Sequence, residues 1–223
     1  MNYTKPIVVG IDFSPASSMV LRHAARLARE EGVPLIALHV VDTSRLSHWL
    51  SGRMDEAEET RIVEEAKAKL AALVAAEPSD VGAEQVVITG RPAEEIQTVI
   101  DDREAGLLVI AANDLSKKRL GLTASSCVRL AHSDVLILRD HQEQPFRKIV
   151  SCVDLLGNSG LVLERGIEAA KHYGAELNVV HVIYPPERDL WGEAMKQGGP
   201  SAEAAERTRA KALNALKHSL DPF

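Results

Sequence analysis

The stretch IVVGIDFSPASSMVLRHAARLAREEGVPLIALHVV, residues 7–41, decides the fold of this chain. Short apolar runs stand at its two ends, at 7–11 and 35–41, and the residues between them follow a helical pattern. Ser14 suits the N-cap of that helix, and Gly32 suits its end. The stretch therefore predicts a strand–helix–strand unit, the building block of a parallel sheet. The apolar side of the expected helix consists of Val20, Leu21, Ala24, Leu27 and Ala28.

The same alternation of short apolar runs and longer helical patterns continues to residue 138. It predicts an α/β domain with an open parallel sheet of five strands, joined by four helices. The three further strands are expected at 85–89, 107–111 and 134–138. The three further helices are expected at about 53–76, in the residues that follow Pro92, and at about 123–132.

The chain then repeats its beginning. A shift of 142 positions lays residues 7–41 on 149–183 without a gap, and eleven of the 35 pairs are identical. The second copy predicts strand, helix, strand and then a helix at about 201–219, but nothing in it matches residues 82–142. We therefore expect two domains, a complete one at 1–142 and an incomplete one at 143–223. The identical pairs include Asp12 with Asp154, Ser17 with Ser159, Gly32 with Gly174, His39 with His181 and Val40 with Val182.

Composition excludes several classes of protein. The formal net charge of −6 argues against nucleic acid as a partner, and no apolar run approaches the ~18 residues of a membrane helix. The first predicted strand begins near the first residue, so no signal peptide is expected. Cys127 and Cys152 lack metal or redox spacing and the histidines are scattered, so we expect a cytoplasmic protein without a metal site.

Three motifs carry a resemblance to a known family. They are Asp12-x-Ser14-x-x-Ser17 after the first strand, LHVVD at 38–42 and TGRP at 89–92. With the strand–loop–helix–strand that ends at residue 138, they resemble the universal stress protein family, and the repeat resembles its tandem-domain branch. The resemblance implies a doubly wound sheet of order 3-2-1-4-5 and dimerisation through the last strand, 134–138. In some members it also implies ATP at the carboxyl ends of the strands.

The phosphate loop of the ATP-binding members departs from its pattern here. Those members show Gly-x-x-Gly, nine residues, then Gly-Ser/Thr, and the matching positions are Ala111, Asp114, Ala124 and Ser125. Glycine lets backbone N–H groups approach phosphate and adopt positive φ, which alanine resists. A carboxylate ~4 Å from phosphate costs about 4 kcal/mol at an effective dielectric near 20. We therefore expect no tight ATP binding, although the basic run 117–119 could offset part of this cost or could be a solvated loop.

Two positions of the family's adenine and ribose side are preserved, Asp12 and Val40. Both recur as Asp154 and Val182 in the half-domain, where no phosphate loop is present. The recurrence favours a role in the fold for Asp12, which would organise the loop into the first helix, and a packing role for Val40. The nucleotide-contacting role is the alternative.

Catalysis is not expected. Asp12 and His39 end neighbouring strands and could form an acid–base pair, but the pair is duplicated and no Gly-x-Ser-x-Gly nucleophile motif accompanies it. The sequence thus predicts a stress-response protein that is no enzyme and acts through dimerisation and contacts with other proteins. The alternatives are an ATP-binding switch or slow ATPase with a degenerate loop, and a sensor of a small non-nucleotide ligand.

Overall fold

The computed structural model describes residues 3–43, 56–77, 82–112, 120–139, 146–155, 157–182 and 202–220. By its internal contacts the chain divides into two compact units, residues 2–143 and 144–223. We call them unit one and unit two. Within the described residues, no helix combines the length and the apolar character needed to cross a membrane.

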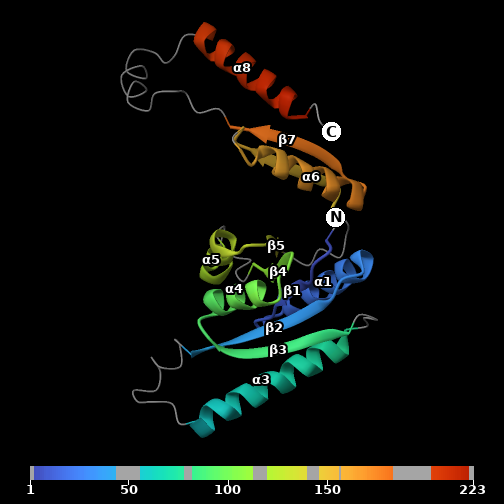
Figure 1. Cartoon of the computed structure of the whole chain (residues 1–223), viewed down its shortest axis with the longest axis vertical. Coiled ribbons are helices and arrows are strands. Elements are labelled where there is room, and N and C mark those ends of the chain that lie inside the picture. The colour runs from blue at the N-terminus through green and yellow to red at the C-terminus, as the bar shows by residue number, and fades with distance from the viewer. Residues whose placement is uncertain are drawn as a thin grey trace, which may run out of the picture. The chain divides into compact units, whose positions relative to one another are not determined.

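Unit one contains a five-stranded parallel sheet with the strand order β3-β2-β1-β4-β5, which confirms the predicted α/β class and topology (Figure 1). The apolar runs form the strands because parallel strands are covered on both faces, so nearly every side chain must be apolar. Residues at the centre of the sheet, such as Val8 and Leu108, are fully buried. The strands are β1 (Ile7–Gly10), β2 (Leu35–Asp42), β3 (Ala83–Gly90), β4 (Leu107–Ala111) and β5 (Asp134–Leu138).

Helices cover both faces of this sheet. Figure 1 shows α3 and α4 on opposite sides of it. Ile96, Val99 and Ile100 of α4 join Ala124 and Cys127 of α5 in one buried cluster with the side chains of β1, β2 and β4 that face them. The helices are α1 (Ser17–Glu31), α3 (Glu56–Ala76), α4 (Pro92–Asp102) and α5 (Leu122–Leu130).

The predicted N-cap of the first helix was wrong. Helix α1 begins at Ser17, three residues after Ser14, and Ala16 occupies the N-cap position without a side-chain bond. The reason is that the backbone N–H of Ser14 donates to Asp12 Oδ1 (3.0 Å), and Ser17 N–H closes a turn onto the Ser14 carbonyl (2.9 Å). The predicted end of the helix is confirmed, because Gly32 adopts the left-handed conformation with φ of 68°.

Unit two is the partial copy that the repeat predicts. Strands β6 (Lys148–Val153) and β7 (Glu176–His181) pair in parallel, and α6 (Ser159–Tyr173) connects them. A Cβ atom at Gly166 of α6 would lie 1.9 Å from Ser151 Oγ, so glycine allows the close approach of helix and strand. Helix α8 (Ala202–Leu220) follows and contacts α6.

Candidate functional site

The carboxyl ends of β1, β2 and β4 open into a cleft of about 720 Å³. Residues after β1 form its floor, α3 supplies one wall, and the start of α5 supplies another. Clefts at the carboxyl edge of a parallel sheet, where the strand order reverses, are the usual ligand sites of open α/β folds. The cleft therefore lies where the sequence predicted a ligand site, and it contains four of the predicted positions: Asp12, Val40, Ala111 and Ala124.

Asp12 holds the loop between β1 and α1. Its Oδ1 accepts hydrogen bonds from the backbone N–H of Ser14 at 3.0 Å and from the hydroxyl of Ser17 at 3.1 Å. The two hydrogen bonds orient the carboxylate toward the start of α1. This geometry gives Asp12 a role in the fold, as the duplication suggested.

His39 joins the ends of two neighbouring strands. Its Nδ1–H donates to the carbonyl of Ile11 at 2.7 Å. Burial lowers the pKa of His39 below its usual value and outweighs the raising effects of the Ile11 carbonyl and the Asp12 charge, while the Lys69 charge lowers it further. The ring is therefore neutral at pH 7, with its proton on the nitrogen that bonds to the strand carbonyl. It offers no positive charge to a ligand.

Phe13 is one of the cleft residues that the sequence did not indicate. It adopts φ of 57°, a left-handed conformation that is unusual for a large side chain. This turn brings its ring to 4.2 Å from the ring of His39, measured between centroids, at an interplanar angle of 37°. No local motif marks the position. Leu155, at the matching place of unit two, adopts the same conformation with φ of 61°, so the repeated block shares this turn.

The same bonds recur in unit two. Ser159 Oγ donates to Asp154 Oδ1 at 3.0 Å, and His181 Nδ1 donates to the Val153 carbonyl at 2.9 Å. Val182, the counterpart of Val40, is exposed there. The Asp–Ser and His–carbonyl pairs are thus properties of the strand–helix–strand block itself and do not depend on the other three strands of a complete sheet.

Two of the predicted phosphate positions carry methyl groups where the family pattern has glycine, and both line the cleft. Ala111 ends β4 in register with Leu138, and Ala124 is buried in the α4–α5 cluster. Ser125 is not among the described residues that line the cleft, and its hydroxyl donates to the backbone carbonyl of Leu120 at 3.5 Å. Asp114 and the basic run 117–119 lie outside the described residues.

The described lining carries more negative than positive charge. The carboxylates of Asp12, Asp42 and Glu65 line the cleft, with Lys69 as the one Lys or Arg among the described lining residues. An excess of carboxylates opposes the binding of a polyanion such as a nucleoside triphosphate. None of the sequence motifs pointed to Glu65 and Lys69, which come from α3.

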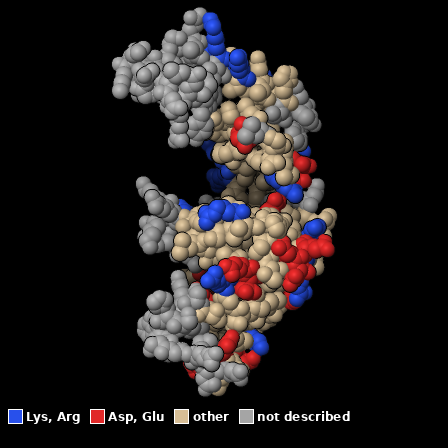
Figure 2. Space-filling view, turned by 60° about the vertical axis from the view of Figure 1, so that its left-hand side comes forward, with Lys and Arg blue, Asp and Glu red and all other residues tan. Residues whose placement is uncertain are grey.

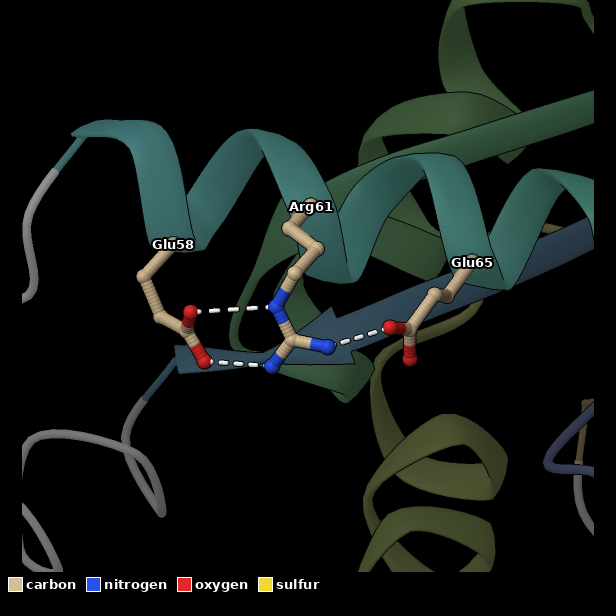
Figure 3. Close-up of polar contacts among 3 residues, drawn as sticks. All are labelled: Glu58, Arg61 and Glu65. Carbon is tan, nitrogen blue, oxygen red and sulfur yellow. Dashed lines mark hydrogen bonds and ion pairs between the residues drawn. The ribbon is translucent and has the colours of Figure 1, made fainter.

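Arg61 does not correct this imbalance. Its guanidinium lies between two glutamates of α3 (Figure 3): Nε and Nη2 donate to Glu58 at 3.1 and 2.6 Å, and Nη1 donates to Glu65. Hydrogen bonding to Arg61 lowers the pKa of Glu58, and the paired carboxylates raise the pKa of the Arg61 guanidinium. Glu58 and Arg61 therefore stay charged, and the guanidinium of Arg61 is occupied by hydrogen bonds to the two carboxylates.

The described residues give little support for a metal site or a reactive cysteine. Within the described residues, no group of three or more histidine, cysteine or carboxylate side chains is placed to hold a metal ion. Burial raises the pKa of the Cys127 thiol, which disfavours the reactive thiolate. The cleft thus offers binding surface that combines apolar side chains, a neutral histidine and an excess of carboxylates.

A doubly wound parallel sheet with a cleft at its carboxyl edge places the chain among the open α/β proteins, whose ligand sites usually lie at this edge. Comparison with known protein families then identifies the family within this fold class. The model of the universal stress protein family matches residues 4–139 and again 145–221. The chain belongs to the universal stress protein family, which confirms the resemblance seen in the sequence, and it carries the family pattern twice.

Individual relatives agree with this assignment. A universal stress protein of Mycobacterium tuberculosis is 30% identical over 157 residues, which cover 62% of this chain and 49% of the relative. The chain thus matches about half the length of that relative. Universal stress protein YxiE of Bacillus subtilis is 31% identical over 150 residues, 60% of this chain and 97% of the relative. A crystal structure of a universal stress protein from Archaeoglobus fulgidus shares the fold with a TM-score of 0.62, at 19% identity, over 87% of this chain and 71% of its own.

Proposed function

We propose that this chain is a non-catalytic universal stress protein of the cytoplasm that acts through contacts between protein chains. The observation that carries the proposal is the open side of β5. This strand pairs with β4 on one side, and no strand among the described residues pairs with its other side. An unpaired edge with apolar side chains favours the addition of another strand.

Helix α5, which contacts β5, exposes apolar side chains of the kind that protein interfaces bury. Val128 and Leu130 lie on α5, which contacts β5, and both are exposed although they are apolar. Val135, Leu136 and Ile137 of β5 are only half-buried. Pairing of β5 with β5 of a second copy would remove these side chains from water, which is the driving force that we expect for a homodimer.

The distribution of surface charge does not favour nucleic acid as the partner. On the face shown in Figure 2, Lys and Arg are scattered among acidic and uncharged residues and do not form one basic patch. Together with the net charge of −6, this supports protein partners over nucleic acid.

Sedimentation equilibrium of the full chain tests the proposed dimer. We expect a dimer for the wild type and a monomer for the double variant Val128→Asp/Leu130→Asp, because two carboxylates would be buried without partners at the interface. Leu213→Asp is the matched control, since Leu213 is a similarly exposed leucine on α8 of unit two. A monomeric wild type, or a dimer that the double variant leaves intact, contradicts the proposal.

The cleft itself favours a second candidate function. Its volume of about 720 Å³ is in the usual range of small-molecule sites. Because its described lining has more carboxylates than cations and has alanine at the positions of Ala111 and Ala124, a ligand less negative than ATP suits it better. Mass spectrometry of the purified protein under native conditions would detect a retained compound of this kind.

A further inference from the structure

One face of the two-stranded sheet in unit two is uncovered, and it carries exposed apolar side chains beside the polar residues Lys148, Glu176 and Asn178. Side chains alternate between the two faces of a strand, and on this face Val150, Val180 and Val182 have exposed fractions of 57%, 41% and 60%. Cys152, between Val150 and the end of β6, is exposed as well. We call these four residues the β6–β7 face. The opposite face of the same strands is covered, because Ser151 and Val153 are buried.

Unit one shows what covers this face in a complete domain. The 142-residue shift lays Val150 on Val8 and Val180 on Leu38, whose exposed fractions are 0% and 1%. Both belong to the cluster that α4 and α5 bury, where Ile96, Val99 and Ile100 provide the aliphatic side chains of α4. A partner suited to the β6–β7 face is therefore a helix whose aliphatic residues are spaced as in α4.

The strand edges of unit two are open as well. In unit one β1 has β4 on the side away from β2, and β2 has β3 on the side away from β1. Within the described residues, β6 and β7 pair only with each other. Backbone N–H and C=O groups at such edges favour the addition of further strands.

The area of the face decides between occupants. Two strands of six residues each present a face of roughly 200 Å², at ~3.3 Å per residue and ~4.8 Å between strands. A stable interface needs about 800 Å² per partner, so two copies stacked through this face alone would not hold together. A partner that covers the face with a helix and also adds strands to the open edges buries much more.

We propose that unit two binds a polypeptide of the strand–helix–strand–helix–strand type, whose first helix covers the β6–β7 face as α4 covers β1 and β2. Residues 82–139 of this chain have that pattern and those aliphatic positions. The surface belongs to unit two, so the proposal is independent of dimerisation through β5.

Alkylation of Cys152 measures whether the face is covered. The full chain with Cys127→Ala keeps Cys152 as its single thiol, since the sequence has two cysteines. The probe is a separate polypeptide with the sequence of residues 82–139, also carrying Cys127→Ala. At a probe concentration about ten times its Kd, we expect N-ethylmaleimide to react with Cys152 roughly tenfold more slowly. A matched control probe carries Ile96→Lys, Val99→Lys and Ile100→Lys and should give no protection.

Each other outcome overturns the proposal. An alkylation rate that the probe does not change, or that both probes slow equally, shows that the face does not bind this kind of segment. Slow alkylation of the chain alone shows that another part of the same chain already covers the face. A Cys152–Cys152 cross-linked dimer in place of protection identifies a second copy as the occupant.

Discussion

The hydroxyl of Ser17 donates a hydrogen bond to the carboxylate of Asp12 across 3.1 Å, and the backbone N–H of Ser14 reaches the same oxygen. These two bonds fix the loop that leads from β1 into α1 and forms part of the cleft floor. They also explain why the helix begins at Ser17, which the local sequence did not indicate.

Replacement of Asp12 should therefore destabilise unit one. We expect Asp12→Ala to lower the free energy of unfolding by about 1.5–3 kcal/mol, the usual range for a hydrogen bond to a charged group. Urea unfolding followed by circular dichroism measures the change. Ser17→Ala removes one of the two bonds and should cost less than Asp12→Ala. Equal stability of Asp12→Ala and wild type would show that the carboxylate does not support the loop.

Replacement by alanine should change the free energy of unfolding in opposite directions at two glycines, one in the first turn of α6 and one directly after its last residue. Gly174 ends the helix with φ of 60°, and an added Cβ meets nothing within 4 Å, so Gly174→Ala costs conformational energy alone, about 1–2 kcal/mol. Gly160 lies in the first turn of the same helix and is equally open, so Gly160→Ala should stabilise by up to about 1 kcal/mol. Urea midpoints of the two variants test the difference, and the same sign for both would refute it.

The pH dependence of stability should contain a contribution from His39. Because burial lowers its pKa in the folded state, the unfolded chain binds the proton more readily as pH falls below the ordinary value of 6.5. The contribution of His39 is therefore fully present above pH 6.5 and declines as pH falls toward its folded pKa. We expect His39→Gln to show a shallower loss of stability over this window in urea unfolding at several pH values. Identical slopes for both proteins would contradict the assigned cause.

The loop that departs from the family pattern should regain affinity for ATP when its glycines are restored. We expect Asp114→Gly to strengthen binding by up to roughly a thousandfold, the equivalent of the ~4 kcal/mol repulsion, and Ala111→Gly to add to it. Calorimetric titration with ATP and magnesium measures both. Glu104→Gly is the control, because it removes an acid at a residue with φ of 47° that does not line the cleft.

Tight ATP binding by the wild type would contradict the interpretation of the loop. So would a wild-type affinity that Asp114→Gly leaves unchanged, because the carboxylate would then not oppose the phosphates. In either case the ATP-binding switch becomes the better account of the cleft.

The fold could be predicted because the signals are local and repeated. The apolar runs at 7–11 and 107–111 are short, bounded by turn residues and almost entirely buried, so their length and composition identify them as strands. Gly32 could be assigned to a helix end because few residues adopt positive φ. The strand order came from the family resemblance, since periodicity does not determine which strands become neighbours.

The cleft was less predictable because its walls come from distant parts of the chain. Asp12 and Val40 follow strands and could be found from the family pattern, whereas Glu65 and Lys69 occupy ordinary positions of a charged helix. Phe13 in the left-handed region gives no local signal, because the loop geometry around Asp12 imposes its conformation. Tertiary contacts, which a single sequence does not display, decide such positions.

The bond from a histidine to the carbonyl of the preceding strand occurs in both units, as His39 to Ile11 and His181 to Val153. Each bond spans only the 35-residue block that was duplicated. A gene segment that encodes this block therefore transfers the means of aligning its own two strands to any protein that acquires it. Such segments are suitable starting modules for recombination and for the engineering of larger sheets.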